Sequence, residues 1–214
     1  MRKVLFALSL TVMALGGLAQ PAFADDGARP TDRFAPPDPN ALSPELRKVY
    51  DTSVRLLGGP YGPRMPMLQS PEVANEWSKL LDALGGTSLS KRYWEIGILA
   101  VARIRNSPFE WWAHAQNAVK LGVPADEIEA LRLGKPASFK DPADAKIYRY
   151  ASALIANAPV SDRVFNEAKG VLGDKDLLNL TILIGYYDTV AMVLKTYRMD
   201  VPPKSSTVPV LVVK

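Results

Sequence analysis

Helix-start signals recur along this chain and constrain its fold more than any other feature. A serine followed by proline and an acidic residue supplies an N-cap, a first-turn proline and a favourable charge at the beginning of a helix. Three segments have this arrangement: Ser43-Pro44-Glu45, Ser70-Pro71-Glu72 and Ser107-Pro108-Phe109-Glu110. Two further starts are expected at Val123-Pro124 and Asp141-Pro142. The pattern indicates a chain built mainly of helices.

The expected helices account for most of the chain. They lie at residues 44–57, 71–84, 90–105, 108–121, 124–132, 142–157, 161–171 and 175–197. Gly85-Gly86, Gly122 and Gly173 fall where helices should end. No segment alternates as a half-buried strand does, although the β-branched Val208 to Val213 is either a short strand or a tail. We therefore predict an all-α fold, a compact helical bundle.

Two segments are apolar on every side. They are residues 93–102 (YWEIGILAVA) and 177–194 (LLNLTILIGYYDTVAMVL). Helices of this kind are usually buried in a core or between subunits. Polar residues, among them Asn179 and Asp188, interrupt the second segment, so burial is favoured over a membrane span.

The first 24 residues have the features of an export signal. Arg2 and Lys3 precede an apolar run over residues 4–18, which is too short for a typical membrane span, and Ala22-Phe23-Ala24 provides a cleavage site. We expect a mature protein in the periplasm or outside the cell, without stable membrane insertion. It would comprise a proline-rich flexible lead-in (residues 25–41), a helical domain (42–200) and a tail (201–214).

The residue types present exclude several kinds of site. The chain has no cysteine and one histidine, so thiol chemistry and thiolate metal sites are excluded and no metal is expected. There is no phosphate loop, dinucleotide fingerprint or basic run, so neither a cofactor nor nucleic acid is expected. A Ser–His–Asp triad or a glycosidase pair of acids stays open, but no local motif supports either.

His114 is the single histidine and the first candidate for a functional residue. Glu110 lies four residues earlier, on the same helix face. Glu110 also completes a capping box with Ser107, which would make it structural. Glu95 is the one charged residue in its apolar segment. It either points to the exposed side, pairs with an arginine such as Arg92 or Arg103, or belongs to a functional site, because a buried carboxylate needs a partner.

These residues form part of a longer pattern. It consists of Glu95 to Ala102, then Glu110-Trp111-x-x-His114, then Gly122-Val123-Pro124-x-x-Glu127-Ile128-x-x-Leu131. The pattern resembles the carboxymuconolactone decarboxylase family, which includes AhpD-type alkylhydroperoxidases. In the thiol peroxidase branch a glutamate and a histidine are 19 residues apart, as Glu95 and His114 are here (114 − 95 = 19). Ser107 and Glu110 stand at the cysteine positions of that branch, so the resemblance is to its cysteine-free relatives.

The resemblance extends more weakly over residues 42–200, through Gly59 to Pro63 and Gly185 to Ala191. It implies an all-helical fold whose subunits assemble through apolar helices into homotrimers or homohexamers. In this reading the catalytic residues are His114, Glu95 and Glu110. His114 is the general acid/base, Glu95 orients its imidazole or shares its proton, and Glu110 is a second acid unless the helix cap uses it. For a small-molecule substrate, the candidate binding residues are Arg103, Arg64 and Trp111.

Three functions are compatible with this pattern. The first is a cofactor-independent lyase or isomerase that acts on a small organic acid or lactone through proton transfer. The second is a non-catalytic periplasmic ligand-binding or scaffold protein on the same fold. The third is a peroxidase that works without the cysteine pair.

Overall fold

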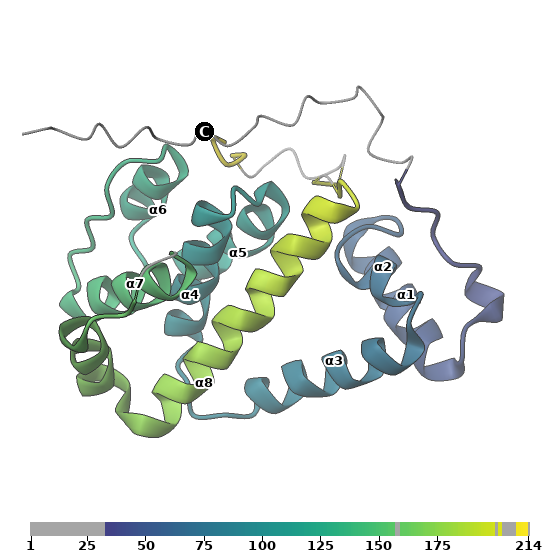
Figure 1. The fold of residues 1–214 in the computed structure, drawn as a ribbon. Helices are drawn as coiled ribbons and strands as arrows, with labels where there is room; N and C mark the ends of the chain where they lie inside the picture. The colour runs from purple at the N-terminus through teal and green to yellow at the C-terminus, as the bar shows by residue number, and fades with distance from the viewer. Residues whose placement is uncertain (1–32, 157–158, 200, 203–208, 214) are drawn as a thin grey trace, which may run out of the picture.

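The computed structural model describes residues 33–156, 159–199, 201–202 and 209–213. These residues contain α-helices and one short 3-10 helix but no strand, which confirms the all-α prediction (Figure 1). The elements are η2 (Pro39–Ala41), α1 (Pro44–Leu57), α2 (Arg64–Met67), α3 (Pro71–Gly85), α4 (Lys91–Ile104), α5 (Pro108–Lys120), α6 (Ala125–Arg132), α7 (Pro142–Ile155) and α8 (Asp162–Thr196). The expected export signal lies outside the described residues.

The start signals place the helices correctly. Helices α1, α3, α5 and α7 all begin at the proline that the sequence indicated. The Ser43 side chain accepts a hydrogen bond from the backbone of Leu46, and Asp141 caps α7 in the same way. The four-residue α2 was not predicted, because a single turn leaves no apolar period to detect.

Gly173 interrupts α8. Its φ of 71° and ψ of 176° are non-helical, so two helical pieces meet at a kink. An L side chain rarely adopts this φ, which is why glycine stands at the junction. The two helices expected on either side of Gly173 are therefore both present, joined without a loop.

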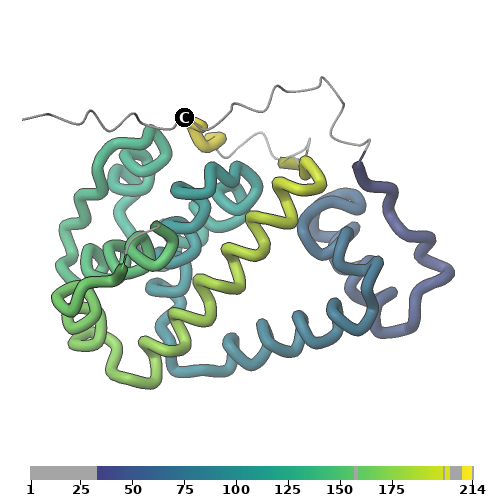
Figure 2. Tube along the Cα trace, viewed as in Figure 1, coloured from purple at the N-terminus to yellow at the C-terminus, as the bar shows by residue number. Residues whose placement is uncertain are grey.

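The helices form two groups that meet along α8 (Figures 1 and 2). The larger core is built from α4, α5, α7 and α8, and every residue of α4 from Trp94 to Ala102 is buried. A smaller core joins α1, α2 and α3 around Leu46 and Met65. A third cluster, which includes Phe109, Tyr186 and the half-buried Trp77, connects the two groups. This seam holds the candidate site.

Helix α8 is buried on one side only. Leu183 and Ile184 are buried, whereas Leu178, Ile182 and Met192 are exposed on the single chain. Within the described residues, α8 is the one helix long and apolar enough to cross a membrane, and half of its most apolar window is buried. The expectation of burial on every side thus holds for α4 and only partly for α8.

The C-terminal residues 209–213 form an extended tail and not a strand. The backbone N–H of Val212 donates to the carbonyl of Arg132 at 3.2 Å, and Leu211 is buried in the larger core. At the other end of the described chain, the Phe34 ring contacts the Tyr197 ring edge to face. Part of the segment expected as a flexible lead-in therefore packs against the end of α8.

Candidate functional site

Glu95 and His114 form a hydrogen-bonded pair. Glu95 lies in the buried part of α4 and His114 in the middle of α5, the next helix, which packs directly against α4. The distance from His114 Nδ1 to Glu95 Oε2 is 2.7 Å. The spacing of 19 residues thus brings the two side chains together across a helical hairpin.

Neither arginine considered as a partner of Glu95 pairs with it. Arg92 forms a bidentate ion pair with the fully buried Asp144 of α7. Arg103 donates to the backbone carbonyls of Arg132 and Val212, at 3.2 and 2.8 Å. The purely structural interpretation of Glu95 as an arginine partner is therefore wrong.

The His114 ring is held from two sides. Its Nδ1 faces Glu95, so the other ring nitrogen, Nε2, lies on the far side of the ring from that carboxylate. Tyr187 of α8 contacts the imidazole edge to face, with ring centroids 5.1 Å apart and an interplanar angle of 87°. Burial, with the nearby Glu95 charge, raises the pKa of Tyr187, so this ring is a neutral phenol at physiological pH.

Glu110 is buried without a hydrogen-bonding partner. Its side chain is 1% exposed, and neither carboxyl oxygen makes a hydrogen bond with any residue that the structure describes. The expected capping box does not form, because the backbone N–H of Ser107 already donates to the carbonyl of Ala102 at 2.9 Å. The interpretation of Glu110 as a capping residue is thus wrong, and its carboxyl group is available for another role.

Burial raises the pKa of Glu110 to about 8. The nearby Ser107 hydroxyl lowers the pKa of Glu110, against the effect of burial, and the negative charge of Asp188 raises it further. Asp188 is itself paired with Arg105 through both carboxyl oxygens. Glu110 is therefore protonated at neutral pH and can act as a proton donor.

Both His114 and Glu110 line a small cavity of about 120 Å³ at the seam between the two helix groups. Arg64 of α2, Trp77 of α3 and Tyr186 of α8 complete much of its wall. The cavity thus combines a histidine held by a carboxylate, a protonated acid and a cationic side chain. Arg64 lines the same cavity as His114. Glu95 does not line it, but its hydrogen bond to His114 connects it to the cavity.

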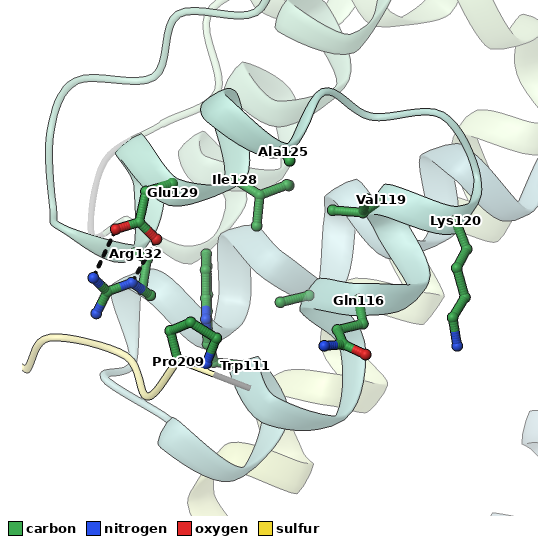
Figure 3. A pocket seen from close by; sticks show the side chains of 10 residues that line it. Trp111, Gln116, Val119, Lys120, Ala125, Ile128, Glu129, Arg132 and Pro209 are labelled. Atoms are coloured by element: carbon green, nitrogen blue, oxygen red, sulfur yellow. Dashed lines mark hydrogen bonds and ion pairs between the residues drawn. The ribbon is translucent and has the colours of Figure 1, made fainter. Parts of the chain in front are cut away.

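Arg103 and Trp111 do not reach this cavity. Arg103 binds the carbonyls that hold the C-terminal tail. Trp111 instead lines a second pocket of about 380 Å³ between α5, α6 and Pro209 (Figure 3). Glu129 and Arg132 form an ion pair at the edge of that larger pocket. The larger pocket is therefore on a different side of α5 from the histidine.

Three aromatic residues of the cavity were not assigned from the sequence. Trp77 stacks on Tyr186 with ring centroids 4.1 Å apart, and Tyr186 contacts Tyr187 at 5.4 Å. The two tyrosines lie in a segment that contributed to the family pattern, but nothing in their spacing indicates which ring reaches His114. Trp77 comes from a separate helix, so its position depends on how α3 packs.

Within the described ranges, no group of three or more His, Cys, Asp or Glu side chains is arranged to hold a metal ion.

The model of the carboxymuconolactone decarboxylase family matches residues 71–151, which run from α3 into α7. This part of the chain is therefore similar to the carboxymuconolactone decarboxylase family. The matched segment contains Glu95, Glu110 and His114, whereas Arg64 and the two tyrosines lie outside it. A comparison with curated proteins gives no match.

Several solved structures share the fold. An uncharacterized peroxidase-related protein from Silicibacter sp. TM1040 has a TM-score of 0.68 at 17% identity, with 82% of this chain and 94% of that chain covered. An AhpD-core protein from Ralstonia eutropha JMP134, also described as peroxidase-related, has a TM-score of 0.69 at 15% identity, with coverages of 83% and 96%. The debrominase Bmp8, solved with 2,3,4-tribromopyrrole, has a TM-score of 0.64 at 12% identity, with coverages of 80% and 92%. At these identities the likeness shows a common AhpD-like fold.

Proposed function

We propose that this protein is a cofactor-independent lyase or isomerase that transfers protons on a small organic acid or lactone. The observation that carries the proposal is the Glu95–His114 hydrogen bond beside the buried Glu110, whose pKa is raised to about 8 by burial. A base and an acid in one cavity are the two groups that such a reaction needs.

In this proposal His114 is the base. The Glu95 carboxylate accepts the Nδ1 proton and so fixes the tautomer whose Nε2 carries a lone pair. Nε2 would remove a proton from a substrate carbon next to a carbonyl group. The electron pair of the broken C–H bond then moves towards the carbonyl oxygen.

Glu110 is the acid of the same cycle. In a β,γ-unsaturated substrate the proton loss gives a dienolate. Glu110 would donate its proton to the γ carbon of this dienolate, and the carbon–carbon double bond would shift into conjugation with the carbonyl group. Proton return from His114 to Glu110 through solvent restores both groups. In the lyase version, loss of CO₂ supplies the electron pair in place of the C–H bond, and the donated proton replaces the carboxyl group.

A thiol mechanism does not apply to this chain, because it contains no cysteine. The names peroxidase and debrominase therefore describe its structural neighbours. We also propose that the mature protein is exported. We further propose a homotrimer or homohexamer, since the exposed apolar side of α8 would be covered by another subunit.

The test uses the purified protein in D₂O with a panel of carboxylated γ-lactones. NMR would follow deuterium uptake at carbon, and CO₂ release would be measured in parallel. We expect uptake or decarboxylation with at least one compound and a loss of about 10² to 10⁴-fold in His114→Gln. The matched control is Gln116→Ala, an exposed residue of α5 that faces the larger pocket.

The alternative function predicts a different result. A ligand-binding or scaffold protein would bind a lactone and return it unchanged and unlabelled between pH 6 and 8. Such a result would exclude the proposed catalytic function, and full turnover by His114→Gln would exclude the proposed mechanism.

A further inference from the structure

A second cavity of about 200 Å³ adjoins the one that holds His114. The two cavities share Pro63, Arg64 and Phe109 in their walls. The second cavity is otherwise lined by the C-terminal half of α1 and by the loop that follows it. The small cavity beside His114 therefore shares a wall, called the partition below, with this second cavity.

Ser53 of α1 lines the second cavity and points to a ligand there. Its side chain is mostly buried, with 6% exposure, but the hydroxyl is not one of the fully buried polar atoms that lack a partner, so it is open to the cavity. A hydroxyl that is open to a cavity can form a hydrogen bond with a ligand there. Thr52 provides a second hydroxyl in the same lining.

Phe109 and Gly62 form the partition. Gly62 has a φ of +90°, and a Cβ on it would lie 3.0 Å from the Phe109 ring and 3.2 Å from Leu57. Glycine is thus required twice, by the backbone conformation and by the close approach to the ring. The loop and the Phe109 ring thus lie in direct contact where the two cavities adjoin.

Arg64 lies between the two cavities and lines both. Within the described part of the chain, no carboxylate forms an ion pair with it. Arginine matches the planar geometry of a carboxylate with two parallel hydrogen bonds. An unpaired guanidinium at this position is placed to hold an anionic group at the junction.

We infer that the ligand of this site is an organic acid that occupies both cavities. Its carboxylate binds Arg64, its reactive end lies beside His114, and a hydroxyl- or carbonyl-bearing tail lies against Ser53. The position of the reactive end rests on the proposed function, whereas the carboxylate and tail positions rest on the second cavity. The structure thus favours an acid with a polar tail over a short, unsubstituted acid.

The probes are paraconic acid, which is a carboxylated γ-lactone, and two derivatives of it. One derivative carries a butyl chain on the carbon next to the carboxyl-bearing carbon, and the other carries the isosteric hydroxypropyl chain. Isothermal titration calorimetry with the purified full chain measures Kd for all three. We expect the hydroxypropyl compound to bind roughly tenfold more tightly than the butyl compound, the value of about one hydrogen bond.

Ser53→Ala should abolish that preference. The matched control is Ser78→Ala on α3, whose hydroxyl already donates to the carbonyl of Ala74, and it should keep the preference. Arg64→Gln should weaken all three acids, and Arg64→Lys should restore part of the affinity. Neutral methyl esters of the probes should bind as weakly to the wild type as the acids bind to Arg64→Gln.

Equal affinities for the butyl and hydroxypropyl compounds would overturn the inference, as would a preference that survives in Ser53→Ala. The absence of saturable binding by all three acids would also overturn it. Deuterium uptake on the lactones is scored separately from Kd. Deuterium uptake without a preference for the hydroxypropyl compound would support the proposed function and contradict this inference. A preference that depends on Ser53, without deuterium uptake, would support this inference and contradict the proposed function.

Discussion

Helix α5 separates two pockets that differ in size and in chemistry. Towards the seam it presents Glu110 and His114 to a cavity of about 120 Å³. Towards α6 it presents Trp111 and Gln116 to a pocket of about 380 Å³ (Figure 3). The smaller cavity therefore contains the groups that can transfer protons, whereas Trp111 lines the larger pocket.

The difference lies in how the ionisable groups of each pocket are satisfied. In the larger pocket, Glu129 is paired with Arg132 at 2.7 Å and remains half-exposed. In the smaller cavity, Glu110 is buried without a partner in the described structure, next to the paired His114. Buried groups with shifted pKa values mark candidate sites better than volume does. The four predictions below test this contrast.

The largest effect is expected for Glu95→Gln. An amide carries no negative charge, and its NH2 group can donate to Nδ1 and so favour the tautomer whose Nε2 is protonated. Turnover should therefore fall by about 10² to 10⁴-fold. Steady-state kinetics on a lactone that takes up deuterium would measure this. Glu129→Gln, on the other side of α5, is the control. Equal activities of the two variants would contradict the assignment of the smaller cavity as the reaction site.

Trp111→Ala should act on stability and not on chemistry. Trp111 is 1% exposed, and removal of such a side chain costs about 3–5 kcal/mol. Urea unfolding monitored by circular dichroism would give the free energy of unfolding, with Trp111→Phe as the milder variant. Turnover by the folded fraction should stay within a few-fold of wild type. A folded but inactive Trp111→Phe would show that the two pockets are coupled.

Glu110 should make stability depend on pH. The unfolded chain loses this proton near the ordinary pKa of 4.5, while the native state keeps it up to about pH 8. Between these values the native state binds more protons, so the free energy of unfolding falls as pH rises, by up to about 1.4 kcal/mol per pH unit, and levels off above pH 8.

Glu110→Gln should remove that slope, because an amide does not titrate. Urea midpoints at pH 5, 6, 7 and 8 would show this, with Glu129→Gln as the control that retains the slope. The pKa of Glu129 is lowered by its hydrogen bond to Arg132, so Glu129 is ionised throughout this range. Parallel curves for wild type and Glu110→Gln would mean that Glu110 is not protonated in the native state.

The smallest effect is expected for Lys120→Ala at the edge of the larger pocket. The side chain is exposed, so the change in unfolding free energy should be within about 0.5 kcal/mol and kcat/KM should be unchanged. A thermal melt and one kinetic series suffice. A tenfold loss of activity would instead place substrate in the larger pocket.

The local signals in the sequence were sufficient for most of the fold. Prolines, N-caps and glycines act on the residues next to them, so α1, α3, α5 and α7 begin where these signals stand. The Glu95–His114 pair was predicted from the resemblance to the family, because the spacing of 19 residues matches it, and the hydrogen bond between the two side chains confirms the pairing. The single turn of α2 and the 3-10 turn η2 are too short for such signals.

The sequence did not distinguish between equivalent candidates. Arg64 and Arg103 were equally suited to bind a carboxylate, and only the packing shows that Arg64 lines the cavity while Arg103 holds the tail. The capping box of Glu110 was plausible from four residues, but the Ser107 N–H is occupied by a carbonyl of the preceding helix. Tyr187 reaches His114 from a helix more than 70 positions later, a contact that no local pattern contains.

The sequence by itself determined the helical class and the helix starts, because each depends on interactions within a helix, and its resemblance to the family indicated the pairing of Glu95 with His114. The tertiary structure decided which side of α5 carries the chemistry. Burial and unpaired carboxyl groups are properties of the space between helices, and that space exists only after α2, α3 and α8 have packed around His114.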